Sequence, residues 1–363
     1  MGVSNDLEKK IGIILPSLAA GGAERVMINY ANYLVDCGYK VSIIVLKNNF
    51  TLEGLIDNKV SQVRLGNSSY KENIISIKKV FEANDYGALY VTMFHVNLMV
   101  LIAKALSSRN IPVIIREANT LSTELTSFSW LKRLFFITLI RVFYRHADHI
   151  IAVSAGVAKD LIKYFRVRPN LVSVILNPVQ VASIVREQYP KVKPNIVAIG
   201  RLEKQKDFST LLRAFQIVRG EINIELQVLG EGSLGEELSM LAKQLGIEEY
   251  VTFRGRVDNV YDFLSTADVF VLSSIYEGCP NSLLEALACG ANVVSTDCPS
   301  GPREILDNGK FGHLVPMQSP ESMAKAIINA IREPIPSVEL VKHSYKFLPK
   351  VQYKKYLDLL RLS

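Results

Sequence analysis

Short apolar runs alternate with amphipathic segments along the whole chain. Residues 11–15 form an apolar run, and after a Gly-Gly turn apolar residues recur at helical spacing, at Val26, Met27, Tyr30, Ala31 and Leu34. The run predicts a buried strand, and the spacing predicts an amphipathic helix. Further strands are expected over residues 41–46, 87–92, 113–115, 149–153 and 172–176. Strands that alternate with helices in this way predict a parallel sheet covered by helices on both faces.

The series is interrupted at Asn177-Pro178, where a turn dipeptide begins an irregular segment that runs to Pro194. A second series of strands then follows, expected over residues 196–200, 224–229, 251–253, 269–272 and 293–295. A chain of 363 residues also suits two domains better than one core.

We therefore expect an α/β protein with two Rossmann-like halves, residues 1–178 and 179–340. Ligands are expected at the carboxyl ends of the strands, in a cleft between the halves. The last amphipathic segment has no strand after it, and residues 341–363 are expected to form a helix that returns to the first half.

The net charge of +7 is unevenly distributed. Residues 101–180 contain 11 Lys and Arg against 4 Asp and Glu, an excess of 11 − 4 = 7. A concentrated positive stretch indicates an anionic partner, either nucleic acid or an anionic membrane.

The four cysteines form no CxxC pair, so neither a zinc site nor a disulfide framework is indicated, and a reducing compartment is expected. The first ten residues are polar, and the apolar run after them is too short for the core of a secretion signal. Asp6 occupies the position where a myristoylation motif requires Ser or Thr. We expect the protein to stay in the cytoplasm.

Acidic, glycine and small polar residues are most concentrated over residues 274–287, directly after an expected strand. The Gly-Cys-Pro-Asn-Ser turn within this segment predicts a helix that begins near Asn281. The backbone N–H groups of Ser282 and Leu283 are then expected to be open to a phosphate, at the positive end of the helix dipole.

Two carboxylates flank this predicted helix start. Glu277 lies in the loop before the helix, and Glu285 lies about one turn inside it. An ionised carboxylate accepts two hydrogen bonds from a vicinal diol, so the pair indicates recognition of a nucleotide sugar. The alternative is that Glu277 is a solvated loop residue and Glu285 a partner of the helix dipole.

Two cations follow the first strand of the second series, Arg201 and Lys206. At the carboxyl end of a strand they are suited to neutralise a diphosphate as it leaves. The chain contains no DxD tripeptide, so no metal-bridged diphosphate is indicated and no cofactor is expected. The alternative is a solvated charged turn.

Glycines mark two further turns between a strand and a helix. Gly21 and Gly22 permit a ligand to approach the backbone and leave helix N–H groups open to an anion, although such glycines also serve packing. Residues 230–235 match GxGxxG in the context of a dinucleotide fingerprint, so a nicotinamide cofactor is a rival interpretation. The acidic residue that should end the next strand is absent, and Arg254 and Arg256 stand there instead.

Aromatic and basic residues are mixed over residues 128–145, and the apolar part of this segment is too short to span a bilayer. It is interpreted either as a core helix or as a helix that lies on an anionic leaflet. The residues expected at an acceptor or membrane surface are Trp130, Lys132, Arg133, Phe135, Phe136 and Arg141.

The segment SIYEGCPNSLLEALACG, with seven residues between its two glutamates, resembles the E-x7-E signature of the retaining glycosyltransferases of family 4. The resemblance extends over most of the chain, through LAAGGAER, GRLEKQKDFSTLLRAF, LGEGS, FRGRVDNV and DCPSGPREI. It implies the GT-B fold, with the donor nucleotide bound mainly by the second half. The opening GGAERVMINYANYL resembles bacterial enzymes that extend undecaprenyl-diphosphate sugars.

The resemblance also implies a role for each site residue. Glu285 would hold the ribose, Glu277 would reach the donor sugar, and Arg201 with Lys206 would clamp the diphosphate. Other donor contacts are implied for Gly21, Gly22, Arg256, Val257, Gly278, Asn281 and Ser282. Of these, Arg256 and Val257 would line the base pocket, and Gly21 and Gly22 would close on the donor phosphates or on the acceptor.

The chain departs from the family pattern at one position. Many relatives carry a His after the strand expected at 113–115, and Ala118 aligns with that position here. His95 is not assumed to replace it, and Glu117 is the next candidate to contact the acceptor or the sugar. A transfer in which the leaving diphosphate takes the proton needs no dedicated protein base.

The expected function is therefore retaining, metal-independent transfer of a hexose or N-acetylhexosamine from a UDP-sugar to a lipid-linked saccharide, on the inner face of the plasma membrane. A GDP-mannose donor and a nucleotide-sugar epimerase remain alternatives, as does a non-catalytic scaffold, which would not require Glu277. We then expect the basic stretch over residues 101–180 to bind an anionic membrane and not nucleic acid.

Overall fold

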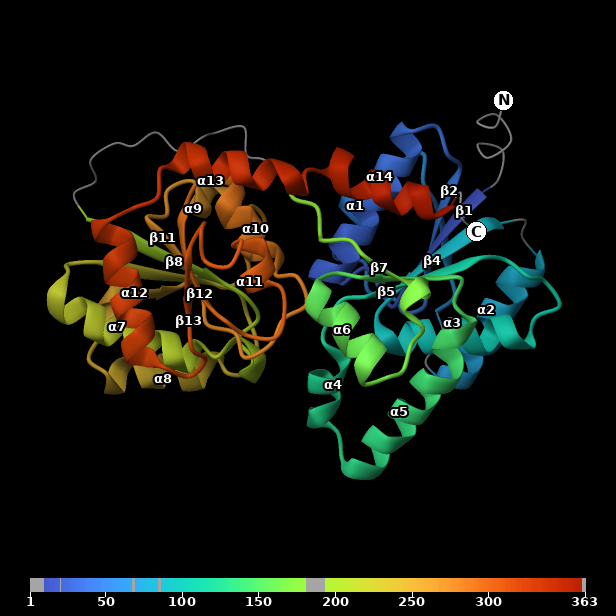
Figure 1. Cartoon of the computed structure of the whole chain (residues 1–363), viewed down its shortest axis with the longest axis horizontal. Coiled ribbons are helices and arrows are strands. Elements are labelled where there is room, and N and C mark those ends of the chain that lie inside the picture. Colours follow the sequence, from blue (N-terminus) through green and yellow to red (C-terminus); the bar gives the residue numbers. More distant parts are fainter. Residues whose placement is uncertain (1–9, 20, 67–68, 84–85, 181–192, 361–363) are drawn as a thin grey trace. The chain divides into compact units, whose positions relative to one another are not determined.

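The computed structural model describes residues 10–19, 21–66, 69–83, 86–180 and 193–360. They form two compact units, the first made of residues 1–177 with 349–363 and the second of residues 178–348 (Figure 1). Most of the irregular segment expected after Asn177 lies outside the described residues. The second unit continues through residue 348, so it extends further than the boundary expected at 340.

The first unit is built on a parallel sheet of seven strands in the order β3-β2-β1-β4-β5-β6-β7. Strands β1 and β2 are mostly apolar and are buried along nearly their whole length, as is typical of parallel strands covered on both faces. Strand β5 is also buried throughout, although it ends in Arg116 and Glu117. The strands are β1 (Lys10–Leu15), β2 (Val41–Val45), β3 (Ser61–Arg64), β4 (Tyr86–Thr92), β5 (Val113–Glu117), β6 (His149–Ala152) and β7 (Val172–Val174).

The helices of the first unit connect these strands. They are α1 (Gly22–Asp36), α2 (Tyr70–Ala83), α3 (Phe94–Leu106), α4 (Leu121–Glu124), α5 (Trp130–Phe143) and α6 (Ala155–Lys163). Strand order reverses between β1 and β4, which makes the carboxyl ends of these two strands the expected ligand site of the sheet.

The chain returns to the first unit in α14 (Pro349–Leu360), which packs against α1. Tyr353 donates a hydrogen bond to the carbonyl of Val26 at 2.9 Å, and the Tyr90 hydroxyl donates to the carbonyl of Tyr356 at 2.7 Å. The ring of Tyr30 lies about 5 Å from the rings of Tyr90, Tyr353 and Tyr356. The C-terminal helix therefore completes the core beside β1 and β4.

Arg116, on β5, is 1% exposed and also contacts α14. Its guanidinium donates hydrogen bonds to the Tyr356 hydroxyl (3.1 Å), the Thr92 hydroxyl (3.1 Å) and the Asn177 side-chain oxygen (2.6 Å). Asn177 is the last residue before the chain enters the second unit, and Tyr356 belongs to the helix that comes back. One buried side chain thus holds both the outgoing and the returning segment.

The second unit has a parallel sheet of six strands in the order β10-β9-β8-β11-β12-β13. They are β8 (Asn195–Ile199), β9 (Glu225–Leu229), β10 (Val251–Phe253), β11 (Val269–Leu272), β12 (Asn292–Thr296) and β13 (His313–Val315). The helices are α7 (Phe208–Glu221), α8 (Gly235–Gln244), α9 (Tyr261–Leu264), α10 (Asn281–Ala288), α11 (Pro302–Ile305), α12 (Pro320–Arg332) and α13 (Ser337–Ser344).

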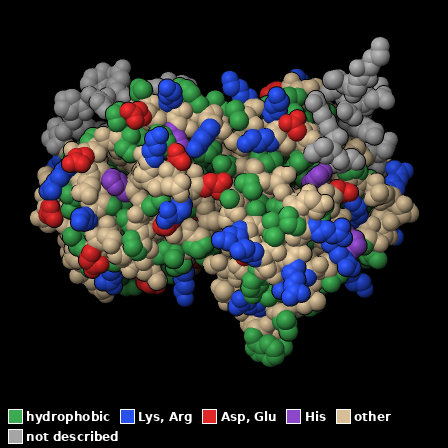
Figure 2. Space-filling view, in the orientation of Figure 1, with side chains coloured by type: hydrophobic (Ala, Val, Ile, Leu, Met, Phe, Trp, Pro, Cys, Tyr) green, Lys and Arg blue, Asp and Glu red, His purple; other side chains and the backbone are tan. Residues whose placement is uncertain are grey.

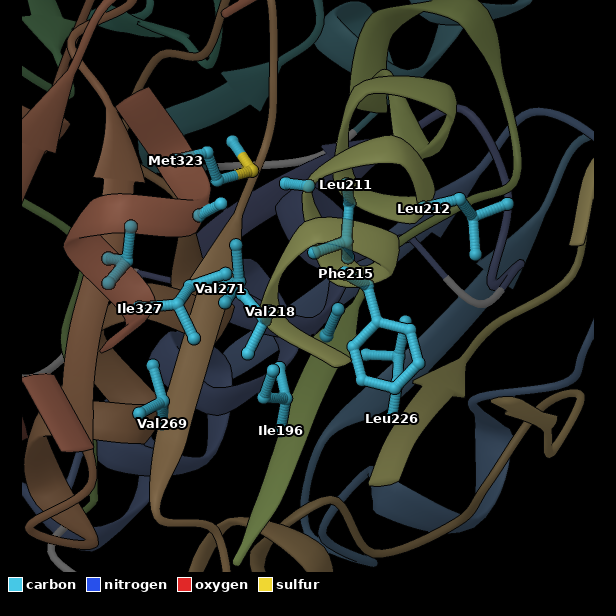
Figure 3. Packing of buried hydrophobic residues seen from close by; sticks show 14 of the residues in the cluster. Ile196, Leu211, Leu212, Phe215, Val218, Leu226, Val269, Val271, Met323 and Ile327 are labelled. Atoms are coloured by element: carbon cyan, nitrogen blue, oxygen red, sulfur yellow. The ribbon is translucent and has the colours of Figure 1, made fainter. Parts of the chain in front are cut away.

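The core of the second unit lies between this sheet and the pair α7 and α12, which pack against each other (Figure 3). Phe215 and Val218 of α7 are fully buried against the strand residues Ile196 and Leu226. Strand order reverses between β8 and β11, so this rigid sheet presents the loops after β8 and β11 side by side.

Two edge strands, β3 and β13, were not expected from the sequence, and the last expected helix is divided into α13 and α14 by a short 3-10 turn and Pro349. Within the residues that the structure describes, no helix is both long and apolar enough to cross a membrane.

Candidate active site

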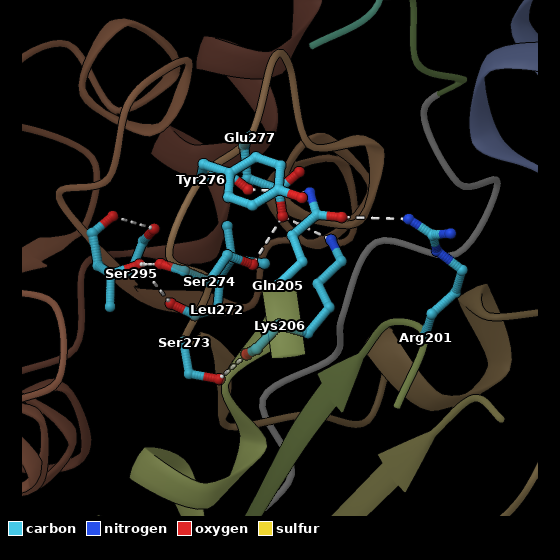
Figure 4. A network of polar contacts seen from close by, with 10 residues as sticks. Arg201, Gln205, Lys206, Leu272, Ser273, Ser274, Tyr276, Glu277 and Ser295 are labelled. Carbon is cyan, nitrogen blue, oxygen red and sulfur yellow. Dashed lines mark hydrogen bonds and ion pairs between the residues drawn. The ribbon is translucent and has the colours of Figure 1, made fainter. Parts of the chain in front are cut away.

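The candidate site of the second unit is formed by the loops that follow β8 and β11 (Figure 4). The first loop carries Arg201 and a 3-10 turn, η5 (Lys204–Lys206), and the second carries Ser274 and Glu277 before α10. The strand order brings together residues more than 70 positions apart in the sequence.

Lys206 and Glu277 form a largely buried ion pair. The Lys206 Nζ lies 2.5 Å from Oε1 of Glu277, and the two side chains are 14% and 7% exposed. The Ser274 hydroxyl donates to the same carboxylate oxygen at 2.6 Å. A Cβ at Gly200 would lie 3.1 Å from Cδ of Lys206, so glycine at this position leaves room for the lysine stem. Two donors on one oxygen hold the carboxylate in a fixed orientation.

The backbone around Glu277 is also tied to neighbouring loops. The Glu277 N–H donates to the carbonyl of Pro299 at 2.8 Å, and the Glu277 carbonyl accepts from the N–H of Ser300 at 3.0 Å. The Thr296 hydroxyl donates to the carbonyl of Ser274 at 2.6 Å. Because a residue fixed through both its backbone and its side chain loses little entropy on binding a ligand, Glu277 is preorganised.

Arg201 is exposed and is joined to the same site through Gln205. The guanidinium donates to the Gln205 side-chain oxygen at 3.1 Å, and the Gln205 amide nitrogen donates to the carbonyl of Tyr276 at 2.9 Å. Neither Gln205 nor Ser274 was among the predicted site residues. In the sequence, both residues lie close to predicted site residues, but position alone does not show which side chains make contact.

Helix α10 begins at Asn281, as predicted, and Glu285 lies half-buried one turn inside it. Its N-cap residue is Pro280, and no side chain caps the helix. The prediction that the N–H group of Leu283 is open to a phosphate is wrong, because that group donates to the carbonyl of Pro280 at 3.2 Å. The anion contacts proposed for this helix are therefore those of Asn281 and Ser282, both of which are half-buried.

The glycine-rich loop after β9 packs against the loop after β8. A Cβ at Gly230 would lie 2.0 Å from the Gly200 carbonyl oxygen, and one at Gly232 would lie 2.4 Å from the Leu202 carbonyl oxygen. The amide of Ser233 donates to Glu203 at 2.9 Å, and that of Leu234 donates to Leu202 at 2.9 Å. These glycines therefore serve close backbone packing.

The same hydrogen bonds bear on the rival nicotinamide interpretation. The backbone N–H and the hydroxyl of Ser233 both donate to the Glu203 carboxylate and lower its pKa, which keeps that carboxylate ionised. A dinucleotide fingerprint needs amides that face a pyrophosphate, whereas these face a carboxylate. The geometry does not fit the rival site. Beyond this loop, Arg256 is exposed and Val257 is half-buried, and the Arg256 N–H donates to the Glu231 carboxylate at 3.3 Å.

In the first unit, Gly21 is the N-cap of α1, and no side chain caps the helix. A Cβ at Gly21 would lie 2.0 Å from Oε2 of Glu24, whose side chain folds back over this glycine and is buried. A carboxylate at this helix N-terminus repels a phosphate and accepts hydrogen bonds from hydroxyl groups. Of the two contacts expected for Gly21 and Gly22, the contact with the acceptor fits better than the contact with the donor phosphates.

Glu117 does not occupy the place expected for a residue that contacts the acceptor or the sugar. It is 1% exposed, and its Oε1 accepts hydrogen bonds from the Asn97 side chain at 2.6 Å and from the Tyr144 hydroxyl. Burial raises the pKa of Glu117 to about 8, against the opposing effect of these two donors. The predicted catalytic contact is corrected to an internal role, in which Glu117 joins β5 to α3 and to the turn after α5.

Helix α5 resolves the choice between a core helix and a surface helix. Ile140 is its one buried residue, and four large apolar side chains near its start are 56–72% exposed, namely Trp130, Leu131, Leu134 and Phe135. Figure 2 shows apolar side chains gathered at the bottom of the view, over the start of this helix, with Lys and Arg side chains above them. The interpretation as a core helix is wrong.

Of the residues predicted for this surface, Phe136 and Arg133 are half-buried and the other four are exposed. Phe136 packs against the rings of Phe94 and Phe128, each 5.5 Å away between centroids. Arg133 and Arg141 donate hydrogen bonds to the hydroxyl and the carbonyl of Tyr164, at 2.9 and 2.8 Å. Lys132 is exposed and lies over the ring of Phe128, 4.2 Å from its centroid. Leu131 and Leu134 were not predicted, because spacing alone does not tell which face of an apolar helix is exposed.

Two parallel-sheet Rossmann-like units in series, together with similar solved structures, define the fold as GT-B. Residues 20–183 match the family described as Glycosyltransferase Family 4, and residues 193–333 match Glycosyl transferases group 1. The chain belongs to glycosyltransferase family 4.

Its relatives include two proteins of Campylobacter jejuni. The N-acetylgalactosamine-N,N'-diacetylbacillosaminyl-diphospho-undecaprenol 4-alpha-N-acetylgalactosaminyltransferase is 28% identical over 362 residues, which cover 96% of each chain. The GalNAc-alpha-(1->4)-GalNAc-alpha-(1->3)-diNAcBac-PP-undecaprenol alpha-1,4-N-acetyl-D-galactosaminyltransferase is 28% identical over 330 residues, 88% of each. Among solved structures, Anabaena Alr3699/HepE in complex with UDP-glucose has a TM-score of 0.83 at 19% identity, over 98% of this chain and 100% of that one.

Proposed function

We propose that this glycosyltransferase moves an N-acetylhexosamine or a hexose from a UDP-sugar to a lipid-linked saccharide, with retention of configuration. The observation that carries the proposal is the buried Lys206–Glu277 pair beside Arg201, at the point where the strand order of the second sheet reverses. In an open parallel sheet, a ligand binds at that point. Glu277 and Glu285 would bind hydroxyl groups of the donor, and Arg201 with Lys206 would bind its diphosphate.

The relatives support the choice of substrates. Both Campylobacter jejuni proteins are named for N-acetylgalactosaminyl transfer to undecaprenol-linked saccharides, and the HepE structure contains UDP-glucose. Both names also specify alpha linkages. Transfer with retention from an alpha-linked donor gives an alpha-linked product, which is the outcome we propose here.

In the proposed reaction, an acceptor hydroxyl attacks the anomeric carbon from the face that the diphosphate leaves. The bond from this carbon to the diphosphate oxygen breaks, the bond to the acceptor oxygen forms, and the departing diphosphate takes the hydroxyl proton. Arg201 and Lys206 stabilise the negative charge that develops on the diphosphate. No metal ion and no protein base take part in this scheme, so Ala118 in place of a histidine does not disable it.

We propose further that the enzyme binds the anionic inner leaflet of the plasma membrane through α5. Exposed apolar residues at the start of the helix would enter the interface, and the excess of basic residues over 101–180 would bind anionic headgroups. Trp130 is the single tryptophan of the chain and is 72% exposed, so it reports directly on this contact.

The function is tested by a donor screen followed by a transfer assay. UDP-N-acetylhexosamines, UDP-hexoses and GDP-mannose are compared by thermal shift, and transfer to a synthetic undecaprenyl-diphosphate saccharide is then measured. The Arg201→Ala variant should lose about 100-fold in kcat, the lower end of the effect seen when one charge-stabilising donor is removed. Arg213→Ala, on the exposed face of α7, is the matched control. Normal turnover of Arg201→Ala would exclude a role for Arg201 in binding the diphosphate. Stabilisation by GDP-mannose alone would mean that the donor is GDP-mannose rather than a UDP-sugar.

Membrane binding is tested with vesicles that contain phosphatidylglycerol. Trp130 emission should shift to shorter wavelength on binding, and Leu134→Glu should weaken the partition at least about tenfold because a charge replaces an exposed apolar side chain that would enter the interface. Met240→Glu, at an exposed apolar position on α8, is the control. Equal binding by all three proteins would exclude α5 as the contact.

A further inference from the structure

Two consecutive residues of the loop after β8 reach across to the same segment of the loop after β11. Lys206 bonds the carboxylate of Glu277, and Gln205 bonds the backbone at Tyr276 and Ile275. Contacts at two adjacent residues therefore fix the positions of these two loops, which carry the candidate donor-binding residues, relative to each other (Figure 4).

Gln205 makes three hydrogen bonds, two to the loop after β11 and one to Arg201 in its own loop. Its backbone carbonyl accepts the N–H of Ile275 at 2.8 Å, and its amide nitrogen donates to the carbonyl of Tyr276 at 2.9 Å. The remaining amide oxygen accepts from the guanidinium of Arg201 at 3.1 Å. The side-chain amide thus anchors one end on the backbone and presents the other to Arg201.

Only an amide of this length matches both partners. A carboxylate at position 205 has no donor for the Tyr276 carbonyl and would form an ion pair that offsets the charge of Arg201. A lysine or arginine would repel Arg201. A neutral amide holds the guanidinium in one orientation and leaves its full charge for a ligand. Arg201 is otherwise exposed, and an arginine side chain that nothing holds must be ordered when the ligand binds, which weakens binding.

We infer that Gln205 is a positioning residue that holds the Arg201 guanidinium toward the diphosphate of the donor. This inference rests on the proposed function, because it assigns the ligand of Arg201. The inference goes beyond the proposed function because it names a residue that affects the reaction only through another side chain.

The test is a double-mutant cycle with inorganic pyrophosphate as the probe, which depends on neither the nucleotide nor the acceptor. Four full-length proteins are compared by calorimetric titration: the wild type, Gln205→Met, Arg201→Ala and the double variant. Methionine keeps the length of the side chain and removes both hydrogen bonds. Gln205→Met should raise the Kd for pyrophosphate about fivefold when Arg201 is present and less than twofold when it is absent.

The outcomes separate the two proposals. If Arg201→Ala binds pyrophosphate as tightly as the wild type, or if the wild type binds none, then the diphosphate role and the inference both fail. If Arg201→Ala weakens binding but Gln205→Met does not, the inference alone fails. Equal weakening by Gln205→Met in both backgrounds would show that Gln205 acts by holding the two loops rather than Arg201, which would also overturn the inference. Gln216→Met, on the exposed face of α7, is the matched control.

Discussion

The buried carboxyl of Glu117 should make the first unit less stable as the pH rises. Burial raises the pKa of this group to about 8, whereas the ordinary value is 4.5. Between these values the unfolded chain has released the proton and the folded unit still holds it. The free energy of unfolding therefore falls by about 1.4 kcal/mol per pH unit in this window and levels off above pH 8. Below pH 4.5 the contribution is fully present.

Glu117→Gln removes the titration and keeps an oxygen that accepts from Asn97 and Tyr144. The stability of the variant relative to the wild type should therefore rise with pH, by about 3 kcal/mol between pH 5.5 and pH 7.5. Hydrogen exchange of a peptide that covers β5 measures the difference in the first unit alone. Comparison of the two proteins at each pH cancels the intrinsic exchange rate.

Glu82→Gln, at a surface position of α2, is the control for the loss of a carboxylate. Its difference from the wild type should not change over the same range. A Glu117→Gln difference that is constant from pH 5.5 to pH 7.5 would refute the reasoning, because it would mean that Glu117 is ionised in the folded unit.

Two further substitutions test buried charges. Lys206→Met should destabilise the second unit by about 3 kcal/mol because it leaves the buried Glu277 carboxylate without its cation, and adding Glu277→Gln should restore most of the loss. A double variant no more stable than the single one would contradict this, as measured by thermal unfolding. Arg116→Met should destabilise the first unit by about 3 kcal/mol, since three buried acceptors lose their donor, whereas the exposed Arg168→Met should not. Hydrogen exchange of a peptide that covers β5 compares the stability of the first unit in these two variants.

The interior strands could be predicted from the sequence because they are continuous apolar runs. Of the four edge strands, β7 and β10 could be predicted from their apolar residues, whereas β3 and β13 could not. β3 reads SQVR and is mostly exposed, and β13 reads HLV and is only partly buried, so neither gives an apolar run. The start of α10 could be predicted because a Gly and Pro turn precedes it.

The candidate donor site was predicted in its charged residues but not in the groups that hold them. Lys206 and Glu277 follow neighbouring strands of one sheet, so their meeting follows from topology. The contacts of Gln205 and Ser274 depend on side-chain conformations that no spacing encodes. Glu117 was assigned wrongly because a residue at the end of a strand can face either the solvent or a covering helix, and α3 covers it.

The path of the chain has a consequence for synthesis on the ribosome. The first unit lacks α14 until the entire second unit has been translated, and until then Tyr30 and Tyr90 have no returning tyrosines to pack against. The nascent first unit must therefore wait with an open apolar face, a state in which chaperones bind. The second unit, which is continuous in sequence, is free to fold as it emerges. The half that is made first is the half that is finished last.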